Sequence, residues 1–244
     1  MRVVAIIPAA GLGTRMAAHN DPTRVPSKQF LSLAGEPVLM HTVRRFFSVQ
    51  RIAAAVLVVR PNEIENVQTM LRDAGFGDRT QVVEGGEKRQ DSVLNGLRAL
   101  TTNPKFLHDD DIVLVHDAVR PLTPADAIDH CIDAVEKHGA AIVGLPAVDT
   151  VKLVERTADG ALVSSTVPRE RVVMAQTPQG FRFRILHDAM DQAIHDGFQG
   201  TDEASLVERA GYDVAVVMGS ASNFKITNPG DLELAAFYLK ANRG

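Results

Sequence analysis

The sequence predicts an α/β fold with a mainly parallel sheet from which a β-hairpin projects. First, short apolar runs alternate with stretches of helical period, as in Val3–Pro8 followed by Val38–Val49. Second, the apolar runs are continuous, which is typical of strands that are covered on both faces. Third, this alternation breaks over residues 149–173, where two extended segments flank the turn dipeptide Asp159-Gly160.

The individual elements follow from the same patterns in chain order. Runs of Val, Ile, Leu and Ala predict strands at Val3–Pro8, Ala53–Val59, Gln81–Glu84, Ile112–Val115, Ala140–Leu145 and Val214–Val217. Amphipathic stretches predict helices at Val38–Val49, Asn62–Asp73, Arg89–Leu100, Pro124–His138, Arg184–His195, Asp202–Ala210 and Pro229–Leu239. Because helices alternate with parallel strands, we expect right-handed crossovers and helices on both faces of the sheet.

We expect residues 1–244 to form a single domain, since no repeat, low-complexity segment or linker interrupts the pattern. Within it, residues 149–173 form the β-hairpin arm. A projecting hairpin exposes strand edges, and pairing with a second subunit is one way to cover them. A surface excursion on a monomer is the alternative.

The composition excludes several functional classes. The 244 residues include 26 Lys and Arg against 30 Asp and Glu, and the net charge of −4 argues against a nucleic-acid partner. No apolar run approaches the roughly 18 residues that cross a membrane. The single cysteine, Cys131, excludes an intrachain disulfide framework and a Cys-based zinc cluster. We therefore expect a cytoplasmic protein that binds neither membranes nor nucleic acids.

A glycine-rich loop, PAAGLGTRM, follows the first predicted strand. Met16 replaces the last glycine of a dinucleotide fingerprint, and no Walker loop is present. The remaining pattern, from Gly11 and Gly13 to Arg15, suits a triphosphate, because backbone amides and a guanidinium both bind phosphate. A tight structural turn explains the glycines equally well.

Two further segments suit an anionic nucleotide. Lys28, in the loop PSKQF, is a candidate for neutralising phosphate charge, with a solvated lysine as the alternative. In EGGEKRQDSV, Gly86 ends a strand, and Arg89 and Ser92 share one face of the first helical turn. A helix N-terminus with these side chains favours an anion or a polar base, whereas helix capping is the alternative.

Asp117 comes directly after the apolar strand in VHDAVRP. A carboxylate beside phosphate loops is a candidate ligand for a metal ion or a hydroxyl group. Arg120 is its expected ion-pair partner, and a purely structural pair is the alternative. We do not expect the adjacent His116 to be catalytic.

Basic and hydroxyl residues recur in the remaining polar segments, including AQTPQ (175–179), which we expect to be a loop. Such side chains at the ends of strands or arms suit an anionic substrate. They are Thr150, Arg169, Thr177, Thr201 and Lys225.

Taken together, these motifs resemble the 2-C-methyl-D-erythritol 4-phosphate cytidylyltransferase family. The matching segments run in order from position 3 to position 239, and they are PAAGLGTRM, PSKQF, EGGEKRQDSV, VHDAVRP, DTVK, AQTPQGF, TDEASLVE and NFKIT. The resemblance implies a three-layer, Rossmann-like nucleotidyltransferase fold and a homodimer formed through the arm. It also implies Mg²⁺-dependent cytidylyl transfer from CTP to the polyol phosphate, with release of pyrophosphate.

The resemblance also implies roles for individual residues. It places Ala9, Ala10, Gly11, Gly86 and Ser92 at the nucleotide, and our motif analysis adds Gly13, Arg89 and Asp117. It implies catalytic roles for Arg15, Lys28, Arg169 and Lys225. Around the polyol phosphate we expect Asp117, Arg120, Thr150, Arg169, Thr177, Thr201 and Lys225, with Asp117 also beside the metal. In the family, Thr150 and Arg169 reach the site from the partner subunit.

The sequence departs from the family where Ser27 separates Pro26 from Lys28 and where the stretch 17–27 is long. Two rival functions stay open. One is a cytidylyltransferase for ribitol 5-phosphate or another polyol phosphate, and the other is a non-catalytic nucleotide-binding homologue.

Overall fold

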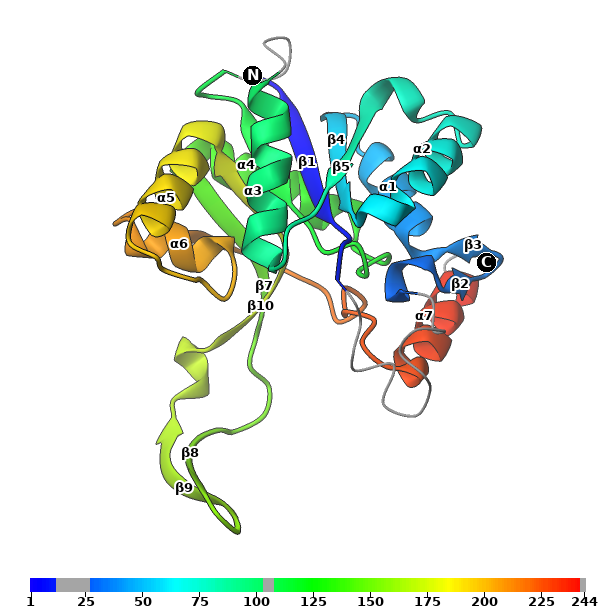
Figure 1. Ribbon diagram of the computed structural model, residues 1–244. Coiled ribbons are helices and arrows are strands. Elements are labelled where there is room, and N and C mark those ends of the chain that lie inside the picture. Colours follow the sequence, from blue (N-terminus) through cyan, green and yellow to red (C-terminus); the bar gives the residue numbers. More distant parts are fainter. Residues whose placement is uncertain (12–26, 103–107, 242–244) are drawn as a thin grey trace.

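A seven-stranded sheet forms the centre of the computed structural model, which describes residues 1–11, 27–102 and 108–241 (Figure 1). In spatial order its strands are β11 (Ala215–Met218), β7 (Ala140–Pro146), β10 (Val173–Arg182), β6 (Ile112–Val115), β1 (Val3–Pro8), β4 (Ile52–Val59) and β5 (Thr80–Glu84). Only β10 runs antiparallel to its neighbours. The expectation of a mainly parallel sheet is therefore confirmed.

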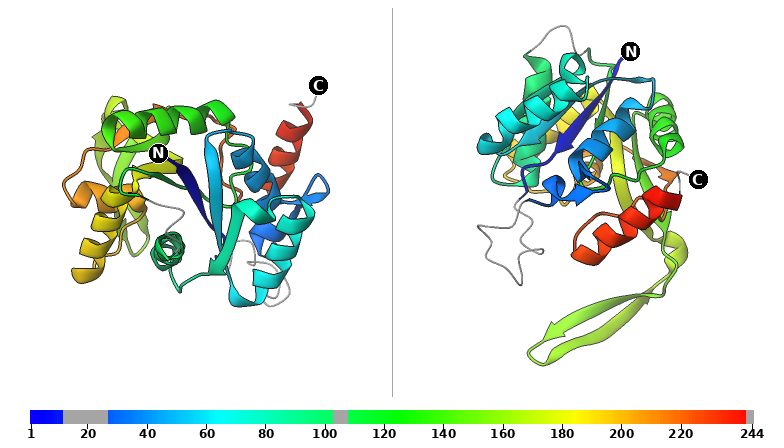
Figure 2. Two further views of the ribbon diagram at one scale, coloured as in Figure 1. Left: turned by 90° about the horizontal axis from the view of Figure 1, so that it is seen from above. Right: turned by 90° about the vertical axis from the view of Figure 1, so that its right-hand side faces the viewer.

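Helices lie on both sides of this sheet (Figure 2). They are α1 (Val38–Phe47), α2 (Ile64–Asp73), α3 (Arg89–Thr101), α4 (Ala125–His138), α5 (Phe183–His195) and α6 (Glu203–Arg209), whereas α7 (Pro229–Ala241) lies outside the two layers. Successive residues of a strand point to opposite faces. Accordingly, Ala5 and Ile7 of β1 pack in the core with α1, α2 and α4, whereas Val4 and Ile6 pack with α3, α5 and α6. The three-layer arrangement is confirmed.

Helix α7 belongs to a third, smaller core outside these layers. Its Ala235 is buried with Leu33, Val38 and Ile226. Leu33 lies on a two-stranded ribbon, β2 (Ser32–Leu33) and β3 (Glu36–Pro37), which the sequence pattern did not predict. This small core joins the segment that follows Lys28 to the segment that follows Lys225, and so it links two parts of the site described below.

The arm projects away from the sheet between β7 and β10 (Figure 1). Its strands are β8 (Val151–Thr157) and β9 (Gly160–Val167), and the short 3-10 helix η5 (Arg169–Arg171) follows them. The turn residues are Ala158 and Asp159, so the turn expected at Asp159-Gly160 was misplaced by one residue. Gly160 opens β9 with φ of 147°, a conformation that favours glycine.

The expected loop over residues 175–179 was wrong, because this segment lies within β10. The sequence VMAQTPQGFR contains Pro178 and Gly180, which weaken a strand prediction. The strand tolerates the proline because its pairing with β7 shifts register between Ala175 and Gln179. Downstream, Gly180 faces Cys131 and Leu114 so closely that an added Cβ would lie 3.1 Å from the Cys131 sulfur and 2.8 Å from a Leu114 methyl carbon.

The other predicted elements differ from the observed ones only near their ends. The helix expected at Asn62–Asp73 begins as the 3-10 helix η3 (Pro61–Glu63) before α2. Cys131 is buried in the core on α4, as its position on the apolar helix face indicates. In the described part of the chain, no helix is both long and apolar enough to span a membrane.

Candidate active site

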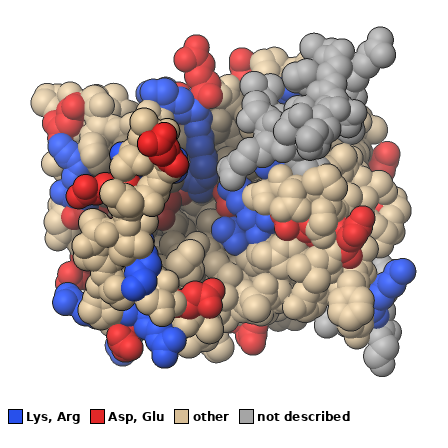
Figure 3. All heavy atoms as spheres, turned by 90° about the horizontal axis from the view of Figure 1, so that it is seen from below, with Lys and Arg blue, Asp and Glu red and all other residues tan. Residues whose placement is uncertain are grey.

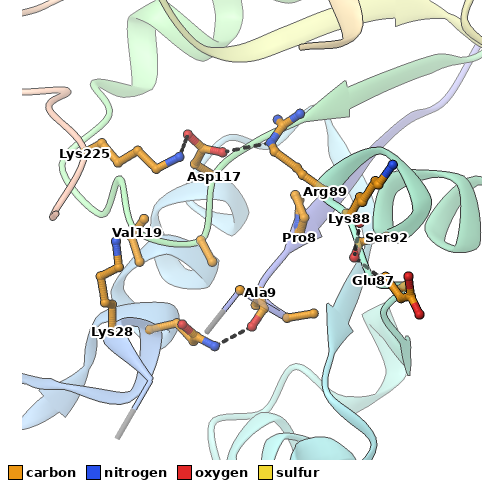
Figure 4. Close-up of a pocket in the computed structure, with 15 residues that line it drawn as sticks. Pro8, Ala9, Lys28, Glu87, Lys88, Arg89, Ser92, Asp117, Val119 and Lys225 are labelled. Carbon is orange, nitrogen blue, oxygen red and sulfur yellow. Dashed lines mark hydrogen bonds and ion pairs between the residues drawn. The ribbon is translucent and has the colours of Figure 1, made fainter. Parts of the chain in front are cut away.

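A pocket of about 260 Å³ lies at the carboxyl edge of the sheet, where three parallel strands end (Figure 4). β1 ends at Pro8 and is followed by residues 9–11, and β5 is followed by residues 85 and 86. Asp117 comes two residues after the end of β6. Open α/β sheets bind ligands at this edge. The pocket is lined by Pro8, Ala9, Ala10, Gly11, Lys28, Gln29, Gly86, Glu87, Lys88, Arg89, Ser92, Asp117, Ala118, Val119 and Lys225.

The loops after β1 and β5 touch each other at a glycine. A Cβ added to Gly85 would lie 2.4 Å from the Cβ of Ala10, so a larger residue would push the loops apart. The amide of Gly86 donates to the Ser92 hydroxyl over 3.1 Å, and this hydroxyl donates to the Lys88 carbonyl over 3.1 Å. Ser92 thus fixes the second loop from the first turn of α3.

Lys28 enters the pocket from the 3-10 helix η2 (Lys28–Phe30). The next residue, Gln29, donates a side-chain hydrogen bond to the carbonyl of Ala9, which ties this helix to the first loop (Figure 4). On the other side, the buried Ser27 lies within hydrogen-bond distance of Arg60 and Glu63. Ser27 is therefore held in place directly before Lys28, and the lysine lines the pocket despite the departure from the family pattern.

Asp117 is the centre of the charged cluster in this pocket. Its Oδ1 lies 3.4 Å from Nε of Arg89, and its Oδ2 lies 3.3 Å from Nε of Arg120 and 3.1 Å from Nζ of Lys225. Burial favours the neutral acid, but Lys225, Arg89 and Arg120 together hold the pKa of Asp117 well below its usual range. Asp117 is therefore ionised, and it holds cations from three separate segments.

Arg89 bridges Asp117 to a second buried carboxylate. Its Nη1 lies 2.7 and 2.8 Å from the two oxygens of Glu203, a residue at the start of α6 that is 1% exposed. Burial lowers the pKa of Arg89, but Glu203 and Asp117 outweigh this effect and raise it above its usual value. Burial also raises the pKa of Glu203, against the opposing effect of Arg89. The guanidinium is thus committed to two anions and does not point freely into the pocket.

Cations outnumber anions around the pocket. Lys28, Lys88, Arg89 and Lys225 line it, with Glu87 and Asp117 as the lining carboxylates. Figure 3 shows Lys and Arg side chains gathered beside the hollow on this face of the molecule. Such a site favours a ligand with several negative charges, although the whole chain carries a net charge of −4.

Comparison with known proteins identifies the family. A family model described as 2-C-methyl-D-erythritol 4-phosphate cytidylyltransferase matches residues 3–241. The chain belongs to this family. It is 59% identical over 240 residues to the cytidylyltransferase of that name from Acidobacterium capsulatum, with 98% of each chain covered. It is 47% identical to the one from Solibacter usitatus, with 98% of this chain and 96% of the relative covered.

Solved structures of the family share this fold. A 4-diphosphocytidyl-2C-methyl-D-erythritol synthase from Anaerococcus prevotii is similar with a TM-score of 0.81 and 30% identity, covering 98% of this chain and 96% of that one. The cytidylyltransferase from Thermus thermophilus gives a TM-score of 0.74 at 30% identity, covering 98% and 100%. The expected nucleotidyltransferase fold of the family is therefore confirmed.

Most residues expected at the nucleotide line the pocket. Those in place are Ala9, Ala10, Gly11, Gly86, Arg89, Ser92 and Asp117, and two of the residues expected to be catalytic, Lys28 and Lys225, line the pocket as well. Gly13 and Arg15 lie outside the described residues, as does the stretch 17–26. Thr201 lies next to the pocket, in a small cavity that it shares with Arg89 and Glu203.

Two candidates from the family pattern lie away from the pocket within one chain. Thr150 and Arg169 belong to the arm, and both are exposed. Arg169 donates to the Val148 carbonyl over 2.9 Å and lies 3.9 Å from Glu170. A single chain therefore does not bring these two side chains to the pocket that Asp117 and Lys225 line.

The residues fit a metal ion that arrives with the nucleotide better than a resident ion. Over residues 1–11, 27–102 and 108–241, no three His, Cys, Asp or Glu side chains come together as possible ligands. The buried carboxylate of Asp117 already faces three cations, and these repel any further positive charge, such as a metal ion. Mg²⁺ commonly binds through one or two carboxylates together with substrate phosphates.

The motif analysis missed the buried partner of Arg89. Glu203 lies in TDEASLVE, but a glutamate in the first turn of a helix is also typical of an exposed residue near the helix dipole. Gln29 was likewise missed as the link to Ala9. A polar residue next to a candidate lysine was the only signal for Gln29.

We predict that Glu203→Gln lowers the free energy of unfolding by about 2 kcal/mol. This is less than the roughly 3–5 kcal/mol of a fully buried pair, because the Arg89 side chain is 32% exposed to water. Urea unfolding measures the change. Glu208→Gln, an exposed position on the same helix, serves as control and should stay within about 0.5 kcal/mol of wild type. Equal stability of the two variants would show that the Arg89–Glu203 pair is energetically unimportant.

Proposed function

We propose that this chain transfers the cytidylyl group of CTP to 2-C-methyl-D-erythritol 4-phosphate in isoprenoid precursor synthesis. The observation that carries this proposal is the cationic cluster around Asp117 at the carboxyl edge of the sheet, in a chain that belongs to the family. A phosphate oxygen of the polyol attacks the α-phosphorus. A new P–O bond forms while the bond to the β-phosphate oxygen breaks, and pyrophosphate leaves.

This reaction needs charge neutralisation and alignment more than a general base. The attacking phosphate is already ionised near neutral pH, whereas both substrates and the transition state are highly anionic. Lys28 and Lys225 lie on the lining of the pocket and are two of the catalytic candidates. The other two are Arg15 on the glycine-rich loop and Arg169 on the arm. Fixed cations stabilise developing negative charge without reorganisation during the reaction.

The two glycine loops suit the nucleotide. Ala9, Ala10, Gly11 and Gly86 lie at the pocket lining, where their backbone can approach phosphate, ribose and base closely. The amides of Ala9 and Gly86 themselves donate to the Val58 carbonyl and the Ser92 hydroxyl. Arg89 lines the nucleotide side of the pocket, and Glu203 and Asp117 hold its guanidinium in place. On the opposite side, Asp117, Arg120 and Lys225 are the proposed contacts of the polyol phosphate, with Thr177 and Thr201 nearby.

Mg²⁺ is the proposed cofactor, and it enters bound to the triphosphate of CTP. The phosphate oxygens of CTP would supply most of its ligands, and Asp117 would be the buried carboxylate of the pocket lining that could join them. When bound, the ion neutralises charge on the transferring and leaving phosphates. The proposed compartment is the cytoplasm, in keeping with the single, buried and unpaired Cys131.

The arm is the proposed dimer contact. A two-stranded hairpin is marginally stable alone, and this one exposes Leu153, Val154, Leu162 and Val163 to water by 51–67%. Apolar side chains so exposed on a protein surface are typical of an interaction site. In a symmetric dimer, the arm of one chain extends over its partner and supplies Thr150 and Arg169 to the partner's pocket.

A substrate panel tests the reaction. With CTP and Mg²⁺, we expect pyrophosphate release with methylerythritol phosphate, and a kcat/KM at least about 100-fold lower with ribitol 5-phosphate, since misaligned substrates lose turnover. Without Mg²⁺ the release should stop. A preference for ribitol 5-phosphate would replace the proposed acceptor, and no release with any polyol phosphate would point to a non-catalytic homologue.

A subunit-mixing experiment tests the contribution of the arm. Arg169→Ala and Lys225→Ala chains should each be nearly inactive. If Arg169 serves the partner's pocket, co-refolding equal amounts gives mixed dimers with one intact site, and activity returns to about a quarter of wild type.

Two controls accompany this mixture. Each variant refolded alone should stay inactive, and size-exclusion chromatography should show dimers in every sample. Activity that stays absent in the mixture would show that Arg169 does not act across the interface.

A further inference from the structure

A chain of buried polar groups lies beneath Asp117, and the proposed chemistry gives no role to its histidine, His116. The His116 side chain is 0% exposed, and its ring centre lies 4.6 Å from that of Phe46. Thr177 of β10 is 5% exposed, and Thr123 is 0% exposed. None of the three lines the pocket. Polar groups buried this deeply need partners, so their hydrogen bonds define what they do.

The ends of this chain fix the direction of its two outer hydrogen bonds. The Asp117 amide can only donate, and it lies 3.1 Å from the Thr177 hydroxyl. The Arg120 carbonyl can only accept, and it lies 3.2 Å from Nε2 of His116. The hydroxyl of Thr177 and Nδ1 of His116 lie 2.9 Å apart between these two ends.

A neutral imidazole with its proton on Nε2 satisfies all three contacts. Nε2–H donates to Arg120, Nδ1 accepts from the Thr177 hydroxyl, and the hydroxyl oxygen accepts from Asp117. Burial favours this neutral form, because a charged ring is costly to keep away from water. The chain is therefore complete, and the Thr177 hydroxyl has its proton committed to His116.

This chain closes around the turn that carries two site residues. The amide of Arg120 donates to the Asp117 carbonyl over 3.1 Å, so the turn is also bonded directly to itself. His116 and Thr177 hold the amide at its beginning and the carbonyl at its end. A second set of bonds continues outward, because Thr123 donates to the amide oxygen of Asn223 over 2.7 Å, two residues before Lys225.

We propose that His116 is a positioning residue, which acts through the Thr177 hydroxyl to fix the Asp117–Arg120 turn and thereby the cations grouped around Asp117. This role rests on the proposed function, in which Asp117 and Arg120 face the polyol phosphate. His116 does not touch the pocket, so its effect on turnover passes entirely through the turn. Thr177 acts as the link between His116 and the amide of Asp117.

Two amide substitutions at His116 separate this role from simple packing. Asparagine can place an oxygen near the position of Nδ1, where it accepts from Thr177. Glutamine is closer to histidine in length and places its amide near Nε2, but it lacks an acceptor at Nδ1. We expect kcat/KM for the polyol phosphate to be about tenfold lower in His116→Gln than in His116→Asn, as for one hydrogen bond. Equal activities, or a better glutamine variant, would overturn the proposal.

Thr177 provides a second pair of variants and a coupling test. Thr177→Ser keeps the hydroxyl, whereas Thr177→Val removes it at nearly constant shape. We expect serine to retain at least about tenfold more activity than valine. In the Thr177→Val background, His116→Gln should lower kcat/KM by less than about twofold, because the hydrogen-bond link is already broken. The same tenfold loss in both backgrounds would overturn the action through Thr177.

Amide hydrogen exchange at Asp117 gives a readout that does not depend on activity. Exchange should accelerate in Thr177→Val and in His116→Gln, and it should stay near wild type in Thr177→Ser. Unaltered exchange in a folded Thr177→Val protein would overturn the hydrogen-bond chain itself. If His116→Gln fails to fold in a thermal unfolding assay, the Thr177 pair decides the question alone. Absence of pyrophosphate release in the wild type would instead contradict the proposed function, while normal exchange at Asp117 would leave the positioning chain in place.

Discussion

The arrangement of this site depends on one buried carboxylate that holds three cations. Arg89, Arg120 and Lys225 come from helix α3, from the turn after β6 and from the segment after β11, and they meet at the oxygens of Asp117. Like charges brought together at the edge of a protein repel one another, and the repulsion grows as water is excluded. Asp117 offsets this repulsion, so a positive site exists before any anionic substrate arrives. Glu203 adds a second anion behind Arg89, which keeps that guanidinium in place.

The sheet explains why these segments can meet. Parallel strands β1, β5 and β6 deliver their carboxyl ends to one edge, where the glycine loops leave room for a ligand. The antiparallel strand β10 lies beside β6 and brings Thr177 under Asp117. The small core around α7 then ties the segments that carry Lys28 and Lys225 to each other. Each of these features results from packing, and together they fix the positions of the charged side chains in the site.

Much of the fold could be predicted because its strands are continuous apolar runs that are covered on both faces. Strand β10 could not, since its polar centre reads as a loop, and only pairing with both β6 and β7 makes it a strand. Asp117 could be predicted as a site residue because a carboxylate that closely follows a buried strand lies at the edge of the sheet where ligands bind. Glu203 could not, because its burial depends on how α6 packs against α5 and β7 and not on any local pattern. The partners of His116 were hidden for the same reason, since Thr177 is 61 residues away in sequence.

The most direct test of this account removes the charge of Asp117 and keeps its shape. In Asp117→Asn, three cations lose their common anion, so an anionic nucleotide should bind at least as tightly as in the wild type. Their alignment is lost, so kcat should fall by about 100-fold or more. Calorimetric titration with CTP and single-turnover kinetics on the folded variant measure the two effects separately. A variant with weakened CTP binding and an unchanged kcat would contradict the central role given to Asp117.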